Sequence, residues 1–528
     1  MNESRPDGLV AIDGSHLKPE RWRRTLFEAL LDTRRAQGGD FQILDGSDNN
    51  PLSFDQFVLA CMVIGRALAR KTRRRERVGV LLPNVSGVAV TFFSLIAVGR
   101  VPAMLNFSAG VRSLTAAVVT AELKTLVTAR AFVQQAGLQS AVDVLAEHCE
   151  IFYLEDIRKG LSRMDKLRGF IDSKRARRMH LRHRIQPDDI AVMLFTSGSE
   201  GVPKGVALTH ANLLSNCEQF ITMLELSSSD RIFNALPVFH SFGLTTGLLA
   251  PVVIGMRTYL YPTPLHYRQI PPLVRESGAT ILTGTDTFAA GWARAADPSD
   301  FAGLRLVFLG AEKVKDATRR LWRERFNIEL YEGYGATEAS PVIAANTQYD
   351  SREGSVGKLM PGLEVALETV PGLDHGGRLH VRGPNVMAGY MRHDTPGTLE
   401  PPDGGWHDTG DIVTIDDDGF VFIRGRAKRF AKIGGEMVSL AAVEAYCSEV
   451  WPDHAHAVTA VAHPRKGETL VLVTDRPEAA REDLIDWAKA HGISELMLPR
   501  NIICVESLPV RGTGKLDYSA IGEIAGAA

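Results

Sequence analysis

Hydrophobic residues recur along this chain at two spacings, which predict helices and strands in alternation. Residues 21–38 and 54–68 carry apolar positions at helical spacing. Apolar runs at 78–84 and 101–105 are predicted as strands, with a helix between them at about 86–98. The alternation continues to about residue 310. It predicts an α/β fold in which helices cover both faces of a sheet.

The pattern changes beyond residue 350, where short strands predominate. Residues 377–383 and 411–415 are predicted strands, and the sequence DDDG at 416–419 is the turn of a hairpin that leads into 420–423. These aspartates lack the ligand spacing and the closing Glu of an EF-hand calcium loop. Helix and strand signals resume in the C-terminal hundred or so residues.

A chain of 528 residues is too long for a single hydrophobic core, so two or more domains are expected. We predict a poorly structured segment at 1–20, a large N-terminal domain at 21–425 and a small C-terminal domain at 426–528. The N-terminal domain is expected to combine mixed sheets and helices with a β-rich subdomain at about 350–425.

Composition narrows the class of protein. Hydrophobic residues make up 45% of the chain and the formal net charge is -2, so no overall positive charge points to nucleic acid. The N-terminus lacks a secretory signal, and the apolar windows 87–98 and 244–256 are too short to span a bilayer. Five cysteines without CxxC spacing favour a reducing compartment over disulfides or a zinc site. We therefore expect a cytoplasmic protein.

One stretch, residues 157–184, is strongly basic. It contains eleven Lys or Arg residues and two acids, Asp165 and Asp172. One interpretation is the solvated face of a helix. The other is a docking surface for an acidic carrier protein or for an anionic membrane, on which the protein would then sit peripherally. The charge count leaves these alternatives open.

A loop rich in Gly and Ser follows the apolar run 190–195 and has the sequence TSGSEGVPKG at 196–205. The run predicts a buried strand, and a helix is predicted from about His210. Glycines and small hydroxyl residues let several backbone N–H groups converge on one anion, and Lys204 adds positive charge. The loop is either a plain surface turn or a phosphate-binding loop. It differs from the GxxxxGK[ST] P-loop, because Gly-Lys-Ser/Thr is absent at the required spacing.

Four further clusters carry residues that a nucleotide-binding site needs. The segment LGAE at 309–312 ends a predicted strand, YEGYGATE at 331–338 and WHDTGD at 406–411 are predicted turns, and PVRGTGK at 509–515 is a predicted flexible loop. With the first loop they offer backbone donors, an aromatic ring, carboxylates for ribose hydroxyls or a metal, and lysines for developing negative charge. Each cluster alone has an ordinary structural interpretation, but five in one chain favour a nucleotide site.

The order of these motifs resembles the adenylate-forming superfamily of acyl-CoA synthetases, peptide-synthetase adenylation domains and luciferases. The motifs are TSGSEGVPKG, YGATE, WHDTGD, GRAKR and GTGK, and the resemblance extends from about residue 25 to 520. The segments LPVFHSFGLT, YPTPLHYR, GAEKV and GRAKRFAKIGGEMVSL are similar to the acyl–acyl-carrier-protein synthetase half of bacterial 2-acylglycerophosphoethanolamine acyltransferases. The resemblance implies a two-step ligase with a mobile C-terminal domain.

In the first step, the resemblance implies that a fatty-acid carboxylate attacks the α-phosphate of ATP and gives acyl-AMP and pyrophosphate. Lys515 would neutralise charge on the carboxylate and α-phosphate, Thr337 would contact the α-phosphate, and Glu338 would hold Mg²⁺. The other implied contacts are Ser197, Gly198, Ser199, Gly201 and Lys204 to the β- and γ-phosphates, Gly310, Ala311, Glu312 and Tyr334 to adenine, and Asp411 and Arg426 to the ribose, with Thr196 and Gly335 completing the nucleotide-binding set.

In the second step, the resemblance implies that the phosphopantetheine thiol of acyl carrier protein attacks acyl-AMP and releases AMP. Lys428 occupies the hinge position about which the C-terminal domain would swing. Gly434 and Gly435 would line the thiol channel, and His240 would stand between that channel and the acyl pocket. The alternative for His240 is a buried structural histidine.

Three residues depart from the pattern of the superfamily. Glu200 stands where Thr or Ser is common, Arg429 where an acid often follows the hinge residue, and Tyr518 where a basic residue often follows the C-terminal lysine motif. Glu200 and Tyr518 suit the acyl-carrier-protein synthetase branch. Three hypotheses stay open: a ligase that uses acyl carrier protein, a ligase that uses CoA, and a non-catalytic relative that binds acyl-adenylate or lipid.

Overall fold

The computed structural model describes residues 10–15, 17–48, 50–197, 202–370, 375–433, 436–463, 467–491, 495–510 and 516–526. The chain divides into two compact units. The larger unit comprises Ile12–Leu363 and Arg382–His407, and the smaller unit comprises Met1–Ala11, Glu364–Val381 and Asp408–Ala528. This division groups residues 408–425 with the C-terminal part, whereas the sequence groups them with the N-terminal domain. The boundary at 426 stays a prediction.

The first sheet of the larger unit has nine strands with a parallel centre. From edge to edge the strands are β16 (Lys358–Leu359), β15 (Val342–Ala345), β14 (Leu330–Gly335), β13 (Leu306–Leu309), β12 (Ile281–Gly284), β10 (Arg231–Asn234), β11 (Arg257–Leu260), β2 (Gln42–Gly46) and β3 (Leu52–Ser53). Strands β14 to β2 are parallel, and β15, β16 and β3 are antiparallel. Every residue of β13 is apolar and buried, as expected for a parallel strand covered on both faces.

The second sheet of the larger unit has seven strands. Their order is β19 (Gly389–Met391), β9 (Pro203–Thr209), β8 (Ile190–Ser197), β5 (Val101–Met104), β4 (Arg77–Val80), β6 (Thr125–Thr128) and β7 (Glu150–Tyr153). Strands β8 to β7 are parallel, and β9 and β19 extend the sheet in antiparallel fashion. The Gly/Ser loop therefore connects β8 to the antiparallel strand β9.

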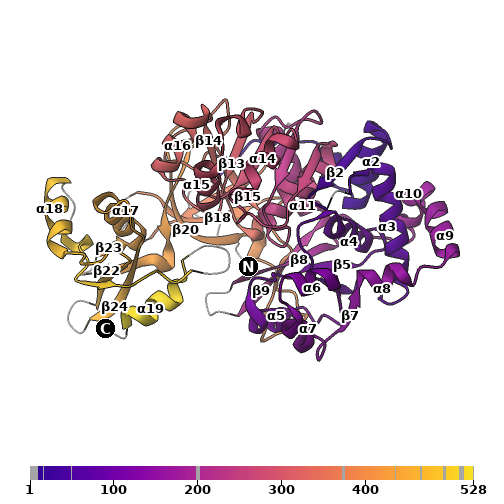
Figure 1. Ribbon diagram of the computed structural model, residues 1–528. Helices are drawn as coiled ribbons and strands as arrows, with labels where there is room; N and C mark the ends of the chain where they lie inside the picture. Colours follow the sequence, from indigo (N-terminus) through magenta and orange to yellow (C-terminus); the bar gives the residue numbers. More distant parts are fainter. Residues whose placement is uncertain are drawn as a thin grey trace. The chain divides into compact units, whose positions relative to one another are not determined.

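Two helices, α4 (Ser86–Ala97) and α11 (His210–Met223), pack between these sheets (Figure 1). Helix α4 contacts β4 and β5 of one sheet and β2 of the other, and α11 contacts β9 and β15. Helix α11 begins with a capping box, in which Thr209 and Asn212 each accept a backbone N–H from the other. Helix α4 is apolar and buried almost all round, which its position between two sheets requires.

The remaining helices of the larger unit cover the outer faces of the sheets or connect strands. They are α1 (Pro19–Trp22), α2 (Leu26–Gln37), α3 (Phe54–Ala69), α5 (Gly110–Thr120), α6 (Arg130–Gln135), α7 (Gln139–Leu145), α8 (Leu154–Lys159), α9 (Arg163–Lys174), α10 (Ala176–Leu181), α12 (Ser241–Leu244), α13 (Ala250–Ile254), α14 (Ile270–Glu276), α15 (Asp286–Ala295) and α16 (Asp316–Phe326). The basic stretch thus folds into α8, α9 and α10, and α9 packs against α3.

Within its described residues, the smaller unit contains two sheets and three α-helices. One sheet has the order β1 (Val10–Ala11), β17 (Glu364–Glu368), β18 (Gly377–Arg382), β20 (His407–Ile415) and β21 (Val421–Arg426). The other has the order β23 (Glu436–Ser439), β22 (Phe430–Ile433), β25 (Gly467–Thr474) and β24 (His456–His463), with β26 (Asn501–Cys504) paired to β25. The helices are α17 (Leu440–Val450), α18 (Arg481–His491) and α19 (Tyr518–Gly526), of which α17 and α19 pack on β24.

The structure confirms the α/β class with mixed sheets. The predicted strands at 101–105 and 190–195 and the predicted helix at 86–98 appear as β5, β8 and α4. The hairpin at 416–419 is also confirmed, since Gly419 has φ of 84° and Asp416 Oδ1 accepts the N–H groups of Asp418 and Phe420. These aspartates therefore shape a turn between β20 and β21.

Two predicted turns are wrong, because strands occupy most of their length. Residues 331–335 belong to β14, and 407–411 belong to β20. Gly333 serves packing, since a Cβ there would lie 2.2 Å from Phe308 Cζ on the neighbouring strand. The sequence alone does not distinguish a glycine required by a neighbour from one required by a turn.

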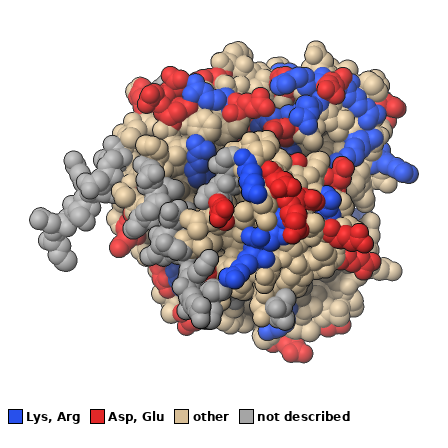
Figure 2. Space-filling view, turned by 90° about the vertical axis from the view of Figure 1, so that its left-hand side faces the viewer, with Lys and Arg blue, Asp and Glu red and all other residues tan. Residues whose placement is uncertain are grey.

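No helix in the described ranges is both long and apolar enough to cross a membrane. The apolar window 87–98 belongs to α4, and the window 244–256 covers α13 and a π-helical turn, Thr245–Leu249. On the face drawn in Figure 2, Lys and Arg side chains are interspersed with Asp and Glu, which matches the near-neutral net charge.

Candidate active site

The predicted phosphate loop lies at the end of the β8–β9 hairpin. The two strands pair antiparallel, with Thr196 opposite Lys204 and Ser197 opposite Pro203. The loop residues Gly198, Ser199, Glu200 and Gly201 lie outside the described residues. The register places Lys204 on the strand that leaves the loop, directly across the ladder from Thr196.

Lys204 belongs to a cluster with Tyr390 and Glu338. Strand β19 pairs with β9 so that Tyr390 lies opposite Val206. Lys204 Nζ is 5.5 Å from the centroid of the Tyr390 ring, a cation–π contact. The Tyr390 hydroxyl donates a hydrogen bond to Glu338 Oε1 at 2.7 Å. One tyrosine therefore connects a cation on β9 with a carboxylate from the segment that follows β14.

Thr337 faces the segment that carries His240. Thr337 and Glu338 lie in the 3-10 turn Thr337–Ala339 that follows β14. Ser241 Oγ and Thr337 Oγ1 are 3.2 Å apart, within hydrogen-bonding distance. His240 directly precedes Ser241 as the N-cap of α12, and its ring lies against Phe239 with centroids 4.6 Å apart. The structure therefore places His240, predicted to stand between the thiol channel and the acyl pocket, close in space to Thr337, the predicted α-phosphate contact.

The apolar residues around His240 are mostly core. Phe239 and Leu244, which flank His240 in the sequence, are buried. Helix α12 continues into the π-helical turn, a local distortion that is frequent at functional sites.

The predicted adenine contacts lie at the carboxyl ends of β13 and β14, which are adjacent parallel strands. Ligands of open α/β sheets commonly bind at this edge. A Cβ at Gly310 would lie 3.3 Å from Gly333 O and 3.4 Å from the Phe242 ring, so the strand ends pack closely. Tyr334 exposes 8% of its surface there. A Cβ at Gly335 would lie 2.3 Å from a backbone carbonyl oxygen, so this position also requires glycine.

Carboxylates brace the loop that follows β13. Ala311 has φ of 68°, and Glu312 Oε2 accepts the backbone N–H and the hydroxyl of Thr287, in the first turn of α15, at 3.1 and 2.8 Å. Glu332 Oε1 accepts the backbone N–H of Val314 at 3.3 Å. Burial raises the pKa of Glu332, while Arg319, 2.6 Å from Oε2, opposes that rise. Glu312 therefore has a structural role, and its contact with adenine stays a prediction.

The two predicted ribose ligands lie side by side in the smaller unit. Asp411 on β20 and Arg426 on β21 are paired across the ladder. Asp411 Oδ1 is 3.0 Å from Arg426 Nε, and the Asp411 side chain is buried while Arg426 is 70% exposed. A buried carboxylate held by an exposed cation is a defined acceptor for hydroxyl groups.

The two departures Arg429 and Tyr518 contact each other. The Arg429 guanidinium lies 3.6 Å from the Tyr518 ring centroid, and Nη2 is 2.6 Å from Glu444 Oε1. The Tyr518 hydroxyl donates to Glu444 Oε2 at 3.3 Å, and burial raises the pKa of Tyr518 to about 12. These residues join the segment after the predicted hinge to the start of α19. The side chain of Lys428 and all of Gly434, Gly435 and Lys515 lie outside the described residues.

Sequence reasoning missed Tyr390 and Ser241. Tyr390 lies in a three-residue strand whose local sequence carries no binding motif, and only its pairing with β9 brings it next to Lys204. Ser241 was within reach of the sequence, because a hydroxyl residue directly follows His240 in the segment that resembles the superfamily.

Comparison with known proteins identifies the family of residues 31–391, which include the motifs TSGSEGVPKG and YGATE. The model of the family described as AMP-binding enzyme matches residues 31–391. A long-chain-fatty-acid–CoA ligase of Yersinia pestis is 32% identical over 357 residues, which are 63% of this chain and 62% of the relative. A protein described as probable 4-coumarate–CoA ligase 3 of Dictyostelium discoideum is 31% identical over 346 residues, 62% of each chain. The chain thus spans about 62% of the length of the curated relatives it matches.

Solved structures of similar fold cover nearly the whole chain. ATP-bound MatB from Rhodopseudomonas palustris matches with a TM-score of 0.79 at 24% identity over 95% of this chain and 99% of that one. The o-succinylbenzoate CoA synthetase of Bacillus subtilis, in complex with ATP and magnesium, matches with a TM-score of 0.77 at 22% identity over 94% and 98%. These similarities establish the fold of both parts of the chain.

Proposed function

Because this chain belongs to the AMP-binding enzyme family, we propose that it is an ATP-dependent fatty-acid ligase. It would first join a fatty-acid carboxylate to AMP, with release of pyrophosphate, and then transfer the acyl group to a phosphopantetheine thiol. The fatty-acid ligases among its relatives support this substrate class, and so does the resemblance of the segment around His240.

The cluster of Lys204, Tyr390 and Glu338 carries this proposal. Adenylation brings an anionic carboxylate against a polyanion, so the site must supply positive charge and a metal-binding carboxylate. Lys204 stands at the end of the phosphate loop, and Tyr390 holds one oxygen of Glu338 in a fixed position. Thr337, tied to the His240 segment through Ser241, would contact the α-phosphate. A loop that only formed a surface turn would not require these contacts.

The residues present fit a magnesium ion bound together with ATP. Magnesium is usually held by one or two carboxylates plus substrate phosphates and water. In the parts of the chain that are described, no group of three or more His, Cys, Asp and Glu side chains could hold a metal on its own. Glu338 has a second oxygen beyond the one that accepts from Tyr390, so it could contribute one ligand. The ion would screen charge between the phosphates and the incoming carboxylate.

The smaller unit would supply the remaining groups. Asp411, kept in place by Arg426, would accept the ribose hydroxyls. Lys515 would neutralise the carboxylate and α-phosphate during adenylation, and Lys428 would serve as the hinge for the second step. Gly434 and Gly435 would then line the thiol channel, with His240 between that channel and the acyl pocket.

We propose acyl carrier protein as the acceptor, and CoA is the second candidate. The resemblance to acyl-carrier-protein synthetases, including Tyr518, supports the first. The names of the relatives, which are CoA ligases, favour the second. The acceptor is tested by thioester formation with a panel of fatty acids, run in parallel with CoA and with holo-acyl carrier protein. Faster acyl transfer to the carrier protein than to CoA supports the proposal. Thioester formation with CoA alone refutes acyl carrier protein as the acceptor.

A further inference from the structure

Helix α9 exposes an unusual number of large apolar side chains. Met164, Leu167, Phe170 and Ile171 are each 47–53% exposed. They fall within about 120° of arc on the helix, so they form one outward stripe. With Leu181 of α10, they are five of the twelve large apolar side chains that the described residues expose. Single exposed apolar residues are ordinary, whereas a contiguous group marks a contact surface.

The opposite face of α9 is small and polar, which reverses the usual orientation of a surface helix. Asp165 forms an ion pair with Arg70, and Asp172 Oδ2 is 3.1 Å from Arg66 Nη1. Arg66 belongs to α3, which lies under α9, and Arg70 directly follows that helix as its C-cap. Turning the apolar stripe inward would break both ion pairs and place apolar side chains against the two arginines.

A glycine allows this close contact between the two helices. A Cβ at Gly169 would lie 2.3 Å from Val63 Cγ2 and 3.1 Å from Val63 Cα. No larger residue fits at this position without separating the helices. The backbone of α9 therefore packs directly on α3, and its bulky residues all point outward.

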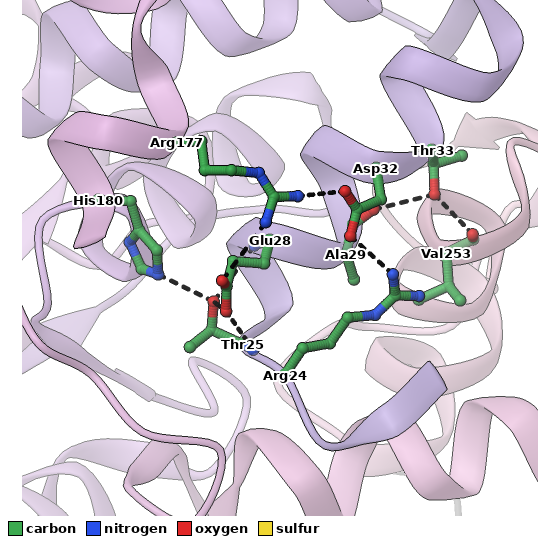
Figure 3. Close-up of polar contacts among 9 residues, drawn as sticks. All are labelled: Arg24, Thr25, Glu28, Ala29, Asp32, Thr33, Arg177, His180 and Val253. Carbon is green, nitrogen blue, oxygen red and sulfur yellow. Dashed lines mark hydrogen bonds and ion pairs between the residues drawn. The ribbon is translucent and has the colours of Figure 1, made fainter. Parts of the chain in front are cut away.

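The basic stretch divides into residues that hold the helices in place and residues that face solvent. Figure 3 shows Arg177 of α10 between Glu28 and Asp32 of α2, with the His180 ring beside Thr25. Lys174 also pairs internally, 3.9 Å from Asp55 Oδ2. Seven exposed cations on and after α9 form no ion pair with the described residues: Arg163, Lys166, Arg168, Arg175, Arg178, Arg182 and Arg184.

We propose that α9 docks this protein on an anionic lipid surface. The helix would lie in the plane of the membrane, with Leu167, Ile171 and their apolar neighbours among the acyl chains. Lys166 borders the stripe on one side and Arg168 on the other, where they would meet lipid phosphates. An apolar face flanked by Lys and Arg is the composition of an interfacial helix, and such cations strengthen binding to anionic leaflets.

Membrane docking through α9 would extend the proposed function, and its purpose depends on that function. Fatty acids partition into bilayers, so a ligase docked through α9 would take its substrate from the surface to which it binds. The apolar stripe favours lipid over an acidic protein partner, because charge alone would suffice to attract acyl carrier protein.

Vesicle co-sedimentation of the full-length protein tests the proposal. The vesicles contain phosphatidylcholine, with or without phosphatidylglycerol. The wild type is expected to sediment with the anionic vesicles, and the variant Leu167→Glu/Ile171→Glu to bind at least about tenfold more weakly. The matched control Leu265→Glu changes an apolar residue of 57% exposure on another segment and should bind like the wild type. A Phe170→Trp variant should show a blue-shifted emission with anionic vesicles only.

Equal sedimentation of the double variant and the wild type, or no sedimentation of the wild type, would overturn the proposal. A protein partner is indicated instead if the double variant keeps its adenylation rate but loses acyl transfer to carrier protein without vesicles. Fatty-acid-dependent ATP–pyrophosphate exchange with a soluble medium-chain acid should be the same in all variants. If the wild type shows no exchange with any acid, the proposed function fails, while the vesicle result still decides the role of α9.

Discussion

Replacing Tyr390 with Phe tests the geometry of the candidate site at a single atom. The variant keeps the ring that lies 5.5 Å from Lys204 Nζ and removes the hydroxyl that donates to Glu338 Oε1 at 2.7 Å. A hydrogen bond to a charged group contributes about 1.5–3 kcal/mol. If the bond is needed to hold Glu338 in the transition state, kcat/KM for adenylation should fall by about 10- to 150-fold.

The assay is fatty-acid-dependent ATP–pyrophosphate exchange over a range of magnesium concentrations. The half-saturating magnesium concentration should rise in Tyr390→Phe, because Glu338 loses the partner that orients it. Tyr349→Phe is the control, since it removes the same hydroxyl from a tyrosine that is 71% exposed and lies outside the cluster. The control should exchange like the wild type. Exchange within about twofold of wild type in Tyr390→Phe, with unchanged magnesium dependence, would refute the role assigned to this cluster.

Three further variants test other parts of the account. Lys515→Ala should abolish adenylation, because the variant loses about 3–4 kcal/mol of transition-state stabilisation. Thioester formation from supplied acyl-AMP should be spared. Equal loss of both half-reactions would contradict the role assigned to Lys515. Asp411→Asn should raise the KM for ATP about tenfold or more, with the fold retained because Arg426 is largely exposed; an unchanged KM would remove Asp411 from the ribose site. Burial lowers the pKa of His210 to about 3, and its Nδ1 accepts the N–H of Leu26, so the folded state holds this ring neutral. The neutral His210 ring contributes fully to the free energy of unfolding above pH 6.5, and this contribution is lost as the pH falls towards 3. At about pH 4.5 the free energy of unfolding is lower by about 3 kcal/mol. His210→Gln should therefore show a smaller drop in its urea midpoint between neutral and acidic pH, and an equal drop would contradict this reasoning.

Much of the fold follows from local sequence patterns. The apolar runs that became β5 and β8 are buried on both faces, and the apolar segment 87–98 became a helix between two sheets. The two wrong predictions are the turns expected at 331–338 and 406–411, and both segments contain glycine. Gly333 lies within a strand, and a glycine is needed there because the Phe308 ring occupies the space that a Cβ would take. The local sequence does not show this neighbour.

The candidate site was only partly predictable for a similar reason. Lys204, Thr337 and Glu338 stand in motifs, and the structure brings them together as expected for one site. Tyr390 was not predicted, because an antiparallel pairing between β19 and β9 puts it there.

The basic stretch shows a second reason why the sequence alone does not predict a surface. Counting charges in 157–184 indicates a basic surface, but it does not show which face of the helix points outward. That orientation is set by the ion pairs of Asp165 with Arg70 and of Asp172 with Arg66, and by the fit of Gly169 against Val63. The apolar residues between the charges then become the more informative feature.

ATP–pyrophosphate exchange directly measures the proposed activation of a fatty acid by ATP. We expect incorporation of labelled pyrophosphate into ATP to require both a fatty acid and magnesium, and to be lost in Glu338→Gln. Absence of exchange with every fatty acid tested, or exchange that needs no acid, would contradict the proposed activation.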